Sequence, residues 1–330
     1  MPTWGKILAE ITSAMQAGNP QAMDTVRNKY FKELYDYTKR NTIIYASRWT
    51  SGDQPANLVS ITDEDLQAFM EALHGLKGKE LDLILHTGGG SAEATDAIVT
   101  YLRQKFDHIR IFIPQAAMSA GTMFACAANE IVMGKHSFIG PIDPQIILNT
   151  QIGAQVVPAA AILAQFKKAQ EECASNPKNL NSWIPMLAQY GPALLVQCQN
   201  QIIFGKELVR DWLMSYMFKG EPPDKPNAIA EYLSNHENFK THGKHINMMR
   251  AKEIGLKIVD LETDQILQEK ILSVFHATMH ALGTSAVKLI SNHNGNAYVK
   301  NLAAVQLINR PPMQLIPPGG PMPGPFPRPR

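Results

Sequence analysis

The chain has 330 residues, 45% of them apolar, and its 31 basic and 29 acidic side chains leave a formal net charge of +2. So small a charge excludes a broad electrostatic attraction to nucleic acid or to an acidic membrane, while the length suffices for one large or two modest domains. Cys126, Cys173 and Cys198 are odd in number and form no Cys-x-x-Cys pair, which argues against a disulfide framework and a structural zinc site.

No targeting or membrane-spanning segment is expected. Residues 1 to 10 lack the basic start and long apolar core of a secretory signal. The longest apolar candidate, residues 154 to 166, contains Pro158 and is shorter than the ~20 residues that cross a bilayer. Because the cysteines also suit a reducing compartment, we expect a cytoplasmic protein.

The first 45 residues are expected to form an N-terminal helical arm. Residues 6 to 40 carry apolar side chains at helical spacing among charged neighbours, which predicts two helices that pack or make oligomer contacts. A short strand at residues 42 to 45 follows. Next comes a helix that opens at residues 61 to 65, with Thr62 as its N-cap.

Residues 81 to 140 alternate between strand and helix patterns. The expected elements are strands at 81 to 86, 109 to 113 and 130 to 133, helices at 91 to 105 and 119 to 128, and an extended piece at 136 to 140. Such alternation predicts an α/β fold with a mostly parallel sheet, helices on its faces and right-handed crossovers.

The C-terminal part is expected to be mainly helical. Helical patterns run through residues 155 to 218, and a strong one covers residues 263 to 282. Residues 311 to 330 contain nine prolines, a composition typical of a disordered tail. The expected divisions are an arm at 1–45, a main domain at 46–262, a helical segment at 263–310 and the proline-rich tail at 311–330.

Three features between residues 81 and 145 suit an acyl-transfer site. The glycines at 88 to 90 follow a strand and precede a helix, so their backbone N–H groups can approach an anion. Ser119 opens a helix of small residues, and Asp143 lies in a rigid turn between two prolines. Taken singly, the glycines also suit a tight turn, Ser119 suits a helix N-cap, and Asp143 suits a hydrogen-bonded turn. Together they follow successive strands, where α/β proteins gather their sites.

The chain resembles the serine dehydrogenase proteinase family over roughly residues 45 to 260. That family is a distant relative of the Clp protease proteolytic subunit and of signal peptide peptidase A, in the crotonase-like fold. The resemblance implies repeated ββα units, a polypeptide substrate, no cofactor and self-association. The main motifs that carry it are Thr87-Gly88-Gly89-Gly90, Ala117-Met118-Ser119-Ala120-Gly121-Thr122, Ala127-Ala128-Asn129-Glu130-Ile131-Val132-Met133 and Gly140-Pro141-Ile142-Asp143-Pro144-Gln145.

By this resemblance the chain is a serine endopeptidase that works through an acyl-enzyme. Ser119 falls on the nucleophile, Asp143 on the acid, and His242 of Thr241-His242-Gly243 on the base. A serine hydroxyl needs a base to take its proton and a third group to orient that base, so each role suits its residue type. The implied oxyanion hole consists of backbone N–H groups of Gly89, Gly90 and Ala120.

Several alternatives stay open. His245 competes with His242 as the base. Lys167 and Lys168 are candidates for a Ser–Lys dyad like that of signal peptide peptidase A, although they lie in a solvated helical pattern. The same backbone cradle would also stabilise a thioester enolate, as in crotonases, and a non-catalytic assembly protein is a further reading. No metal site is expected, because His276 and His280 have metalloprotease spacing without the required glutamate.

Overall fold

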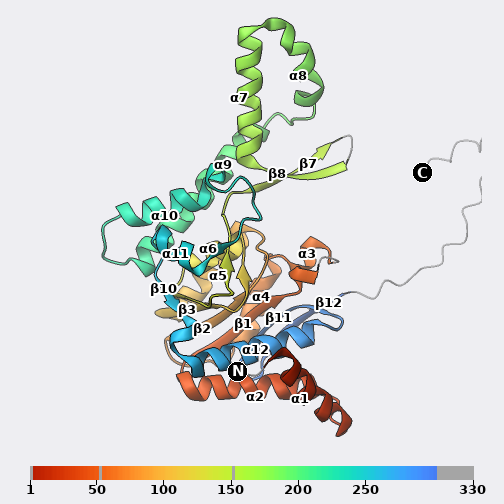
Figure 1. Ribbon diagram of the computed structural model, residues 1–330, viewed down its shortest axis with the longest axis vertical. Coiled ribbons are helices and arrows are strands. Elements are labelled where there is room, and N and C mark those ends of the chain that lie inside the picture. The colour runs from red at the N-terminus through yellow and green to blue at the C-terminus, as the bar shows by residue number, and fades with distance from the viewer. Residues whose placement is uncertain (1–2, 52–53, 151–152, 303–330) are drawn as a thin grey trace, which may run out of the picture.

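A computed structural model describes residues 3–51, 54–150 and 153–302 of the chain (Figure 1). The proline-rich segment predicted at 311–330 lies outside these residues. In the described ranges, no helix has the length and apolar character needed to cross a membrane.

A seven-stranded sheet forms the centre of the molecule, in the order β10-β5-β3-β2-β1-β11-β12. The first five strands in this order run parallel. β11 pairs antiparallel with β1, and β12 pairs antiparallel with β11. This confirms the predicted α/β fold with a mostly parallel sheet. The strands are β1 (Asn41–Ser47), β2 (Glu80–His86), β3 (His108–Ile113), β5 (Glu130–Met133), β10 (Ile258–Asp260), β11 (Ala286–Asn292) and β12 (Ala297–Asn301).

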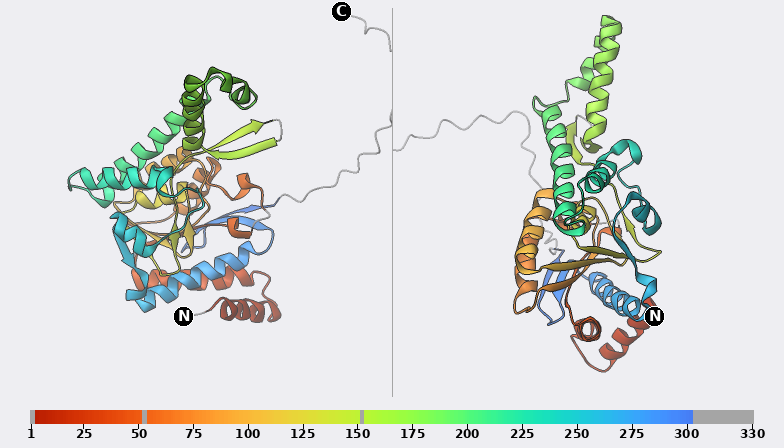
Figure 2. Two further views of the ribbon diagram at one scale, coloured as in Figure 1. Left: turned by 45° about the horizontal axis from the view of Figure 1, so that its top comes forward. Right: turned by 90° about the vertical axis from the view of Figure 1, so that its left-hand side faces the viewer.

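Helices cover both faces of the sheet because successive strand residues point to opposite sides. On β1, Ile43 and Tyr45 pack against α4 (Glu64–Leu73), α5 (Ala92–Lys105) and α6 (Ala120–Cys126). Ile44 and Ala46 face the other way, toward the N-terminal helices and α12. Figures 1 and 2 show this second layer, in which the elements are α1 (Trp4–Gln16), α2 (Ala22–Thr38) and α12 (Gln265–Leu282).

The helix expected at residues 263 to 282 is α12 and ends at Leu282, but two antiparallel strands then follow where the helical segment was expected to continue. Residues 286–301 form β11 and β12, and β11 pairs with β1 in the central sheet. The expected domain boundary between residues 45 and 46 falls inside β1. The division of the chain into domains stays a prediction.

Residues 145–212 project from the body of the molecule (Figure 1). This projection begins with a hairpin of β7 (Gln145–Thr150) and β8 (Gly153–Pro158). The hairpin replaces the start of the helix that was expected from residue 155. The helices of the projection are α7 (Ala159–Ser175), α8 (Leu180–Leu187) and α9 (Leu194–Trp212).

The remaining elements are short. Three short strands form a second sheet, in the order β4 (Ala116–Ala117), β6 (Phe138–Ile139) and β9 (Ile246–Asn247). The short helices are α3 (Ala56–Val59), α10 (Asp224–Ser234) and α11 (Met248–Ile254), and the single-turn segments are η1 (Trp49–Ser51), η2 (Pro177–Asn179), η3 (Leu213–Met217), η4 (His236–Asn238) and η5 (Leu261–Thr263).

The N-cap predicted for the helix after residue 61 is wrong. The helix begins at Glu64, and the Thr62 hydroxyl has no hydrogen-bond partner among the described residues. Instead, the Thr62 backbone N–H donates to the buried Asp65 carboxylate at 3.0 Å. A side chain inside the first turn thus binds the backbone N–H of the residue that was expected to cap the helix.

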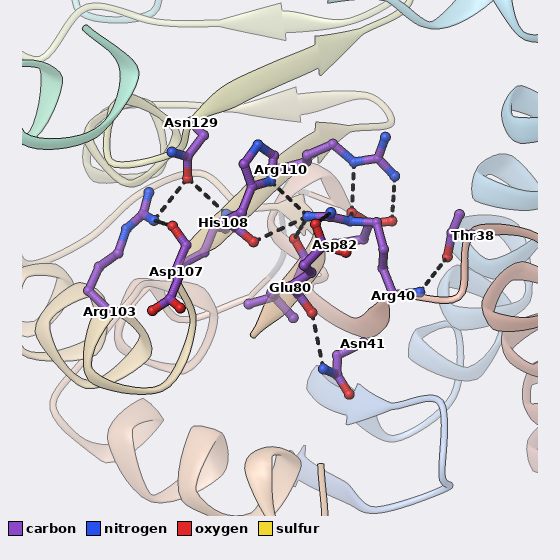
Figure 3. A network of polar contacts seen from close by, with 12 residues as sticks. Thr38, Arg40, Asn41, Glu80, Asp82, Arg103, Asp107, His108, Arg110 and Asn129 are labelled. Carbon is purple, nitrogen blue, oxygen red and sulfur yellow. Dashed lines mark hydrogen bonds and ion pairs between the residues drawn. The ribbon is translucent and has the colours of Figure 1, made fainter. Parts of the chain in front are cut away.

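Ion pairs occupy the amino ends of the parallel strands (Figure 3). The fully buried Asp82 accepts hydrogen bonds from Arg40 Nε at 2.7 Å and from Arg110 Nη2 at 2.7 Å. Arg40 also pairs with Glu80. Because these charges satisfy one another, this end of the sheet is structural, and the predicted site residues follow the opposite ends of the strands.

Candidate active site

The glycine loop after β2 is held tightly by its neighbours. The Gly89 carbonyl accepts a hydrogen bond from the Ile61 N–H at 2.8 Å, and the Ser91 N–H donates to the Ile61 carbonyl at 3.0 Å. A Cβ atom on Gly90 would lie 2.3 Å from the Ile61 carbonyl oxygen, and both Gly89 and Gly90 have positive φ. Only glycine fits this close backbone approach.

Ser119 occupies a strained backbone position at the start of α6. Its φ of 52° and ψ of −120° lie where few residues with a Cβ are found. The side chain is half-buried and does not cap the helix, although the sequence position suggested an ordinary N-cap. Its hydroxyl is therefore not used to hold the helix in place.

The glycine loop and the serine are in direct contact. A Cβ atom on Gly89 would lie 2.7 Å from the Ser119 Cβ and 3.0 Å from the Ala120 nitrogen. The Thr87 N–H and carbonyl pair with Ala116 and Met118, which joins the loop to the segment before the serine. The structure thus brings Ser119 together with the three residues predicted for the oxyanion hole.

The three predicted donors differ in their hydrogen bonding. The Gly89 N–H donates to the Thr87 hydroxyl at 3.1 Å. Within the described part of the chain, the N–H groups of Gly90 and Ala120 have no hydrogen-bond partner. Ala120 is the first residue of α6, where no intrahelical acceptor exists. Two of the three donors are therefore available in this conformation.

Asp143 is buried and contacts two histidines. Its Oδ1 lies 2.7 Å from His242 Nδ1, and its Oδ2 lies 2.9 Å from His236 Nδ1. The Gln145 amide donates to Oδ2 at 3.2 Å. His236 was not among the predicted site residues. The available signal was the cluster of three histidines at residues 236, 242 and 245.

The serine and the acid–histidine pair are neighbours but are not joined by a hydrogen bond among the described residues. Ser119 lines a pocket of about 210 Å³ with Gly90 and Ala120. Residues on both sides of Asp143, namely Ile142, Pro144 and Gln145, line the same pocket, whereas His242 does not.

The competing bases lie elsewhere. His245 is exposed and stacks on Phe138, with ring centroids 4.8 Å apart. The side chains of Lys167 and Lys168 are 77% and 67% exposed on α7, each beside a glutamate four residues later. Neither lysine lines the Ser119 pocket.

A larger cavity of about 810 Å³ lies between α1 and α12. It is lined by Trp4, Phe275, His276 and His280 among others, and none of the predicted site residues reaches it. The smaller pocket is the better candidate because it holds the strained serine and the free backbone donors.

The sequence matches the family of ClpP-like SDH-type serine proteinases over residues 58–291. Two uncharacterized proteins of Methanocaldococcus jannaschii are 32% and 36% identical to it over 199 residues. The matched part is 60% of this chain and 60% and 59% of those proteins, so the chain spans about 60% of the length of these relatives.

Among solved structures, a mutant of a membrane-bound stomatin-specific protease is 17% identical, with a TM-score of 0.36 over 61% of this chain and 74% of its own. The ClpP catalytic domain of Plasmodium falciparum is 13% identical, with a TM-score of 0.32 over 69% and 89%. An enoyl-CoA hydratase/isomerase of Marinobacter aquaeolei is 12% identical, with a TM-score of 0.32 over 70% and 77%.

Proposed function

Because the chain belongs to the ClpP-like SDH-type serine proteinases, we propose that it hydrolyses peptide bonds through an acyl-enzyme on Ser119. The observation that carries this proposal is the contact of the Ser119 Cβ with the glycine loop at a strained backbone position. Strain of about 1–3 kcal/mol persists only where the surrounding structure enforces it, and it is common at active sites.

His242 is the proposed base, and Asp143 orients it. When His242 Nδ1–H donates to Asp143 Oδ1, the Nε2 atom of the ring carries a lone pair. Nε2 takes the proton of the Ser119 hydroxyl as Oγ attacks the peptide carbonyl, and it later returns that proton to the leaving amine. Substrate binding is expected to bring Oγ within ~2.6–3.2 Å of Nε2, a bond that is often formed only in the substrate complex.

The proposed oxyanion hole consists of the N–H groups of Ala120 and Gly90. Both are without a partner in the described structure and both residues line the pocket with Ser119. The Gly89 N–H already donates to Thr87, so the main contribution of Gly89 is space for the serine. Donors fixed in advance stabilise the developing negative charge without having to reorganise.

The pocket beside Ser119 fits an apolar side chain of a polypeptide substrate. Met123, Ile142 and Phe204 contribute apolar lining, and Gly205 of α9 also lines the pocket. A Cβ atom on Gly205 would meet the Met123 methyl carbon at 3.8 Å. A volume of about 210 Å³ holds one residue rather than a folded segment.

A fluorophosphonate probe, which reacts with activated serines, tests the assignment of the nucleophile. We expect the wild-type protein to be labelled at Ser119 and the Ser119→Ala variant to remain unlabelled. Ser175→Ala is a matched control, because Ser175 is an exposed serine on α7 whose hydroxyl donates to the Glu172 carbonyl at 2.9 Å. Equal labelling of wild type and Ser119→Ala would show that Ser119 is not the nucleophile.

A further inference from the structure

Three buried polar side chains form a cluster behind the glycine loop. Lys288 of β11 pairs with Asp65 of α4 at 2.7 Å and 2.9 Å, and both side chains are at most 1% exposed. The Tyr45 hydroxyl of β1 donates to the same carboxylate at 2.8 Å. The cluster thus ties together three elements that are far apart in the sequence.

The cluster fixes the segment at residues 60–62. The Lys288 ammonium donates to the Ser60 carbonyl at 2.7 Å, and Asp65 accepts the Thr62 N–H at 3.0 Å. Between them lies Ile61, whose N–H and carbonyl bond to Gly89 and Ser91 on either side of Gly90. Lys288 and Asp65 are therefore linked to the glycine loop through residues 60–62, and Tyr45 joins them through Asp65.

A second connection runs through Thr87. Burial and the Asp65 carboxylate raise the pKa of Tyr45, and the neighbouring Thr87 hydroxyl offsets part of that rise. The Thr87 hydroxyl also accepts the Gly89 N–H at 3.1 Å. Tyr45 is thus linked to the loop both through Asp65 and through Thr87.

Stability alone does not account for this buried ion pair. Desolvation lowers the pKa of Lys288 even though Asp65 favours its charged form. Replacing a buried pair by apolar side chains of similar volume is often neutral or stabilising, because the charges are costly to remove from water. What apolar side chains would not provide is the set of directed bonds to Ser60 and Thr62.

We propose that Tyr45, Asp65 and Lys288 are positioning residues, which set the glycine loop and thereby aim the Gly90 N–H at the reacting carbonyl. This inference rests on the proposed function for its effect on catalysis. Its structural part, the control of the loop by the cluster, does not depend on activity.

Tyr45→Phe removes one hydroxyl and keeps the ring, so the variant should fold. We expect the rate of acylation and kcat for a peptide substrate to fall about 10- to 100-fold with KM nearly unchanged, because a displaced oxyanion donor acts mainly in the transition state. Hydrogen exchange of the amides at residues 88–91 should become faster. An Asp65→Leu, Lys288→Met double variant, which leaves no unpaired charge, should show the same two effects.

Arg110→Gln is the matched control. It weakens a different ion cluster, at the amino ends of the strands (Figure 3), where Arg110 pairs with the buried Asp82. We expect this variant to have a lower melting temperature. Its acylation rate, normalised to the amount of protein labelled at Ser119, and the hydrogen exchange at residues 88–91 should not change.

The inference would be overturned if both cluster variants had the acylation rate and the hydrogen exchange of the wild-type protein. It would also be overturned if Arg110→Gln changed these two quantities as much as the cluster variants do. If wild-type protein is not labelled at Ser119, the proposed function fails. The exchange measurement then still decides whether the cluster holds the loop.

Discussion

The Cβ atom of Ser119 lies 2.7 Å from the position that a Cβ atom on Gly89 would occupy. This contact joins two segments that follow different strands of the sheet, β2 and β3. It also explains why both positions adopt positive φ, since the chain must turn sharply at each to bring the backbones so close. Any side chain at position 89 would force the nucleophile away from its backbone donors.

Gly89→Ala should therefore reduce kcat by about 10²–10³, the loss typical of a damaged oxyanion hole. The added methyl group would also lie 2.7 Å from the Met118 carbonyl oxygen, which cannot move without shifting the backbone. The rate of probe labelling per folded molecule measures this effect.

Gly153→Ala provides the control for backbone strain, because Gly153 has a similar φ of 111° and no described atom lies within 4 Å of an added Cβ. It should cost stability but leave labelling intact. A similar loss of labelling in both variants would show that strain, and not the contact with Ser119, is responsible.

Ser119→Gly should be more stable than Ser119→Ala by about 1 kcal/mol. Both changes remove the hydroxyl, but only glycine adopts the φ of 52° at this position without strain. Chemical denaturation of the two variants gives the difference in free energy of unfolding. Equal stabilities would mean that the backbone at residue 119 stores no strain.

His242→Asn should lower kcat by about 10⁴, whereas His236→Asn should lower it less than about tenfold. Both histidines contact Asp143, at 2.7 Å and 2.9 Å, so either variant leaves the carboxylate with one imidazole partner. Only the base is lost in the first case. The opposite order of activities would assign His236 as the base.

Stability should depend on the ionisation of His86 between about pH 6.5 and pH 4. Burial lowers the pKa of His86 to about 4, and the backbone of Ala116 offsets only part of this shift. Among the described residues, neither ring nitrogen makes a hydrogen bond of normal geometry, and the ring packs against Trp49 and Phe275. The buried ring is therefore neutral at physiological pH.

In this pH range the unfolded chain binds a proton at residue 86 and the folded chain does not, so stability falls as the pH falls. The loss is about 3 kcal/mol once the pH is below 4. His86→Phe should remove this part of the pH dependence, which denaturant titrations of both proteins at several pH values would reveal. Identical pH profiles would contradict the effect of burial on the pKa.

The sequence determined the alternating core of the fold and its main chemical features. Strand and helix patterns between residues 81 and 133 depend on neighbours a few positions apart, and the structure has these elements within one or two residues of the expected bounds. The glycines at 88–90 and Ser119 were placed correctly relative to the strands for the same reason. Neighbours in the sequence are enough to predict a turn at the glycines and a helix start at Ser119.

Only the tertiary structure decided which side chains meet. His236 contacts Asp143 across 93 residues, and Lys288 pairs with Asp65 across 223. Lys288 lies in the middle of β11, where a charged side chain weakens the apolar pattern of a buried strand. Its burial is favourable only because the buried Asp65 carboxylate pairs with it. Partners at such separations leave no periodic trace in the sequence, because their contact depends on how the whole sheet is assembled.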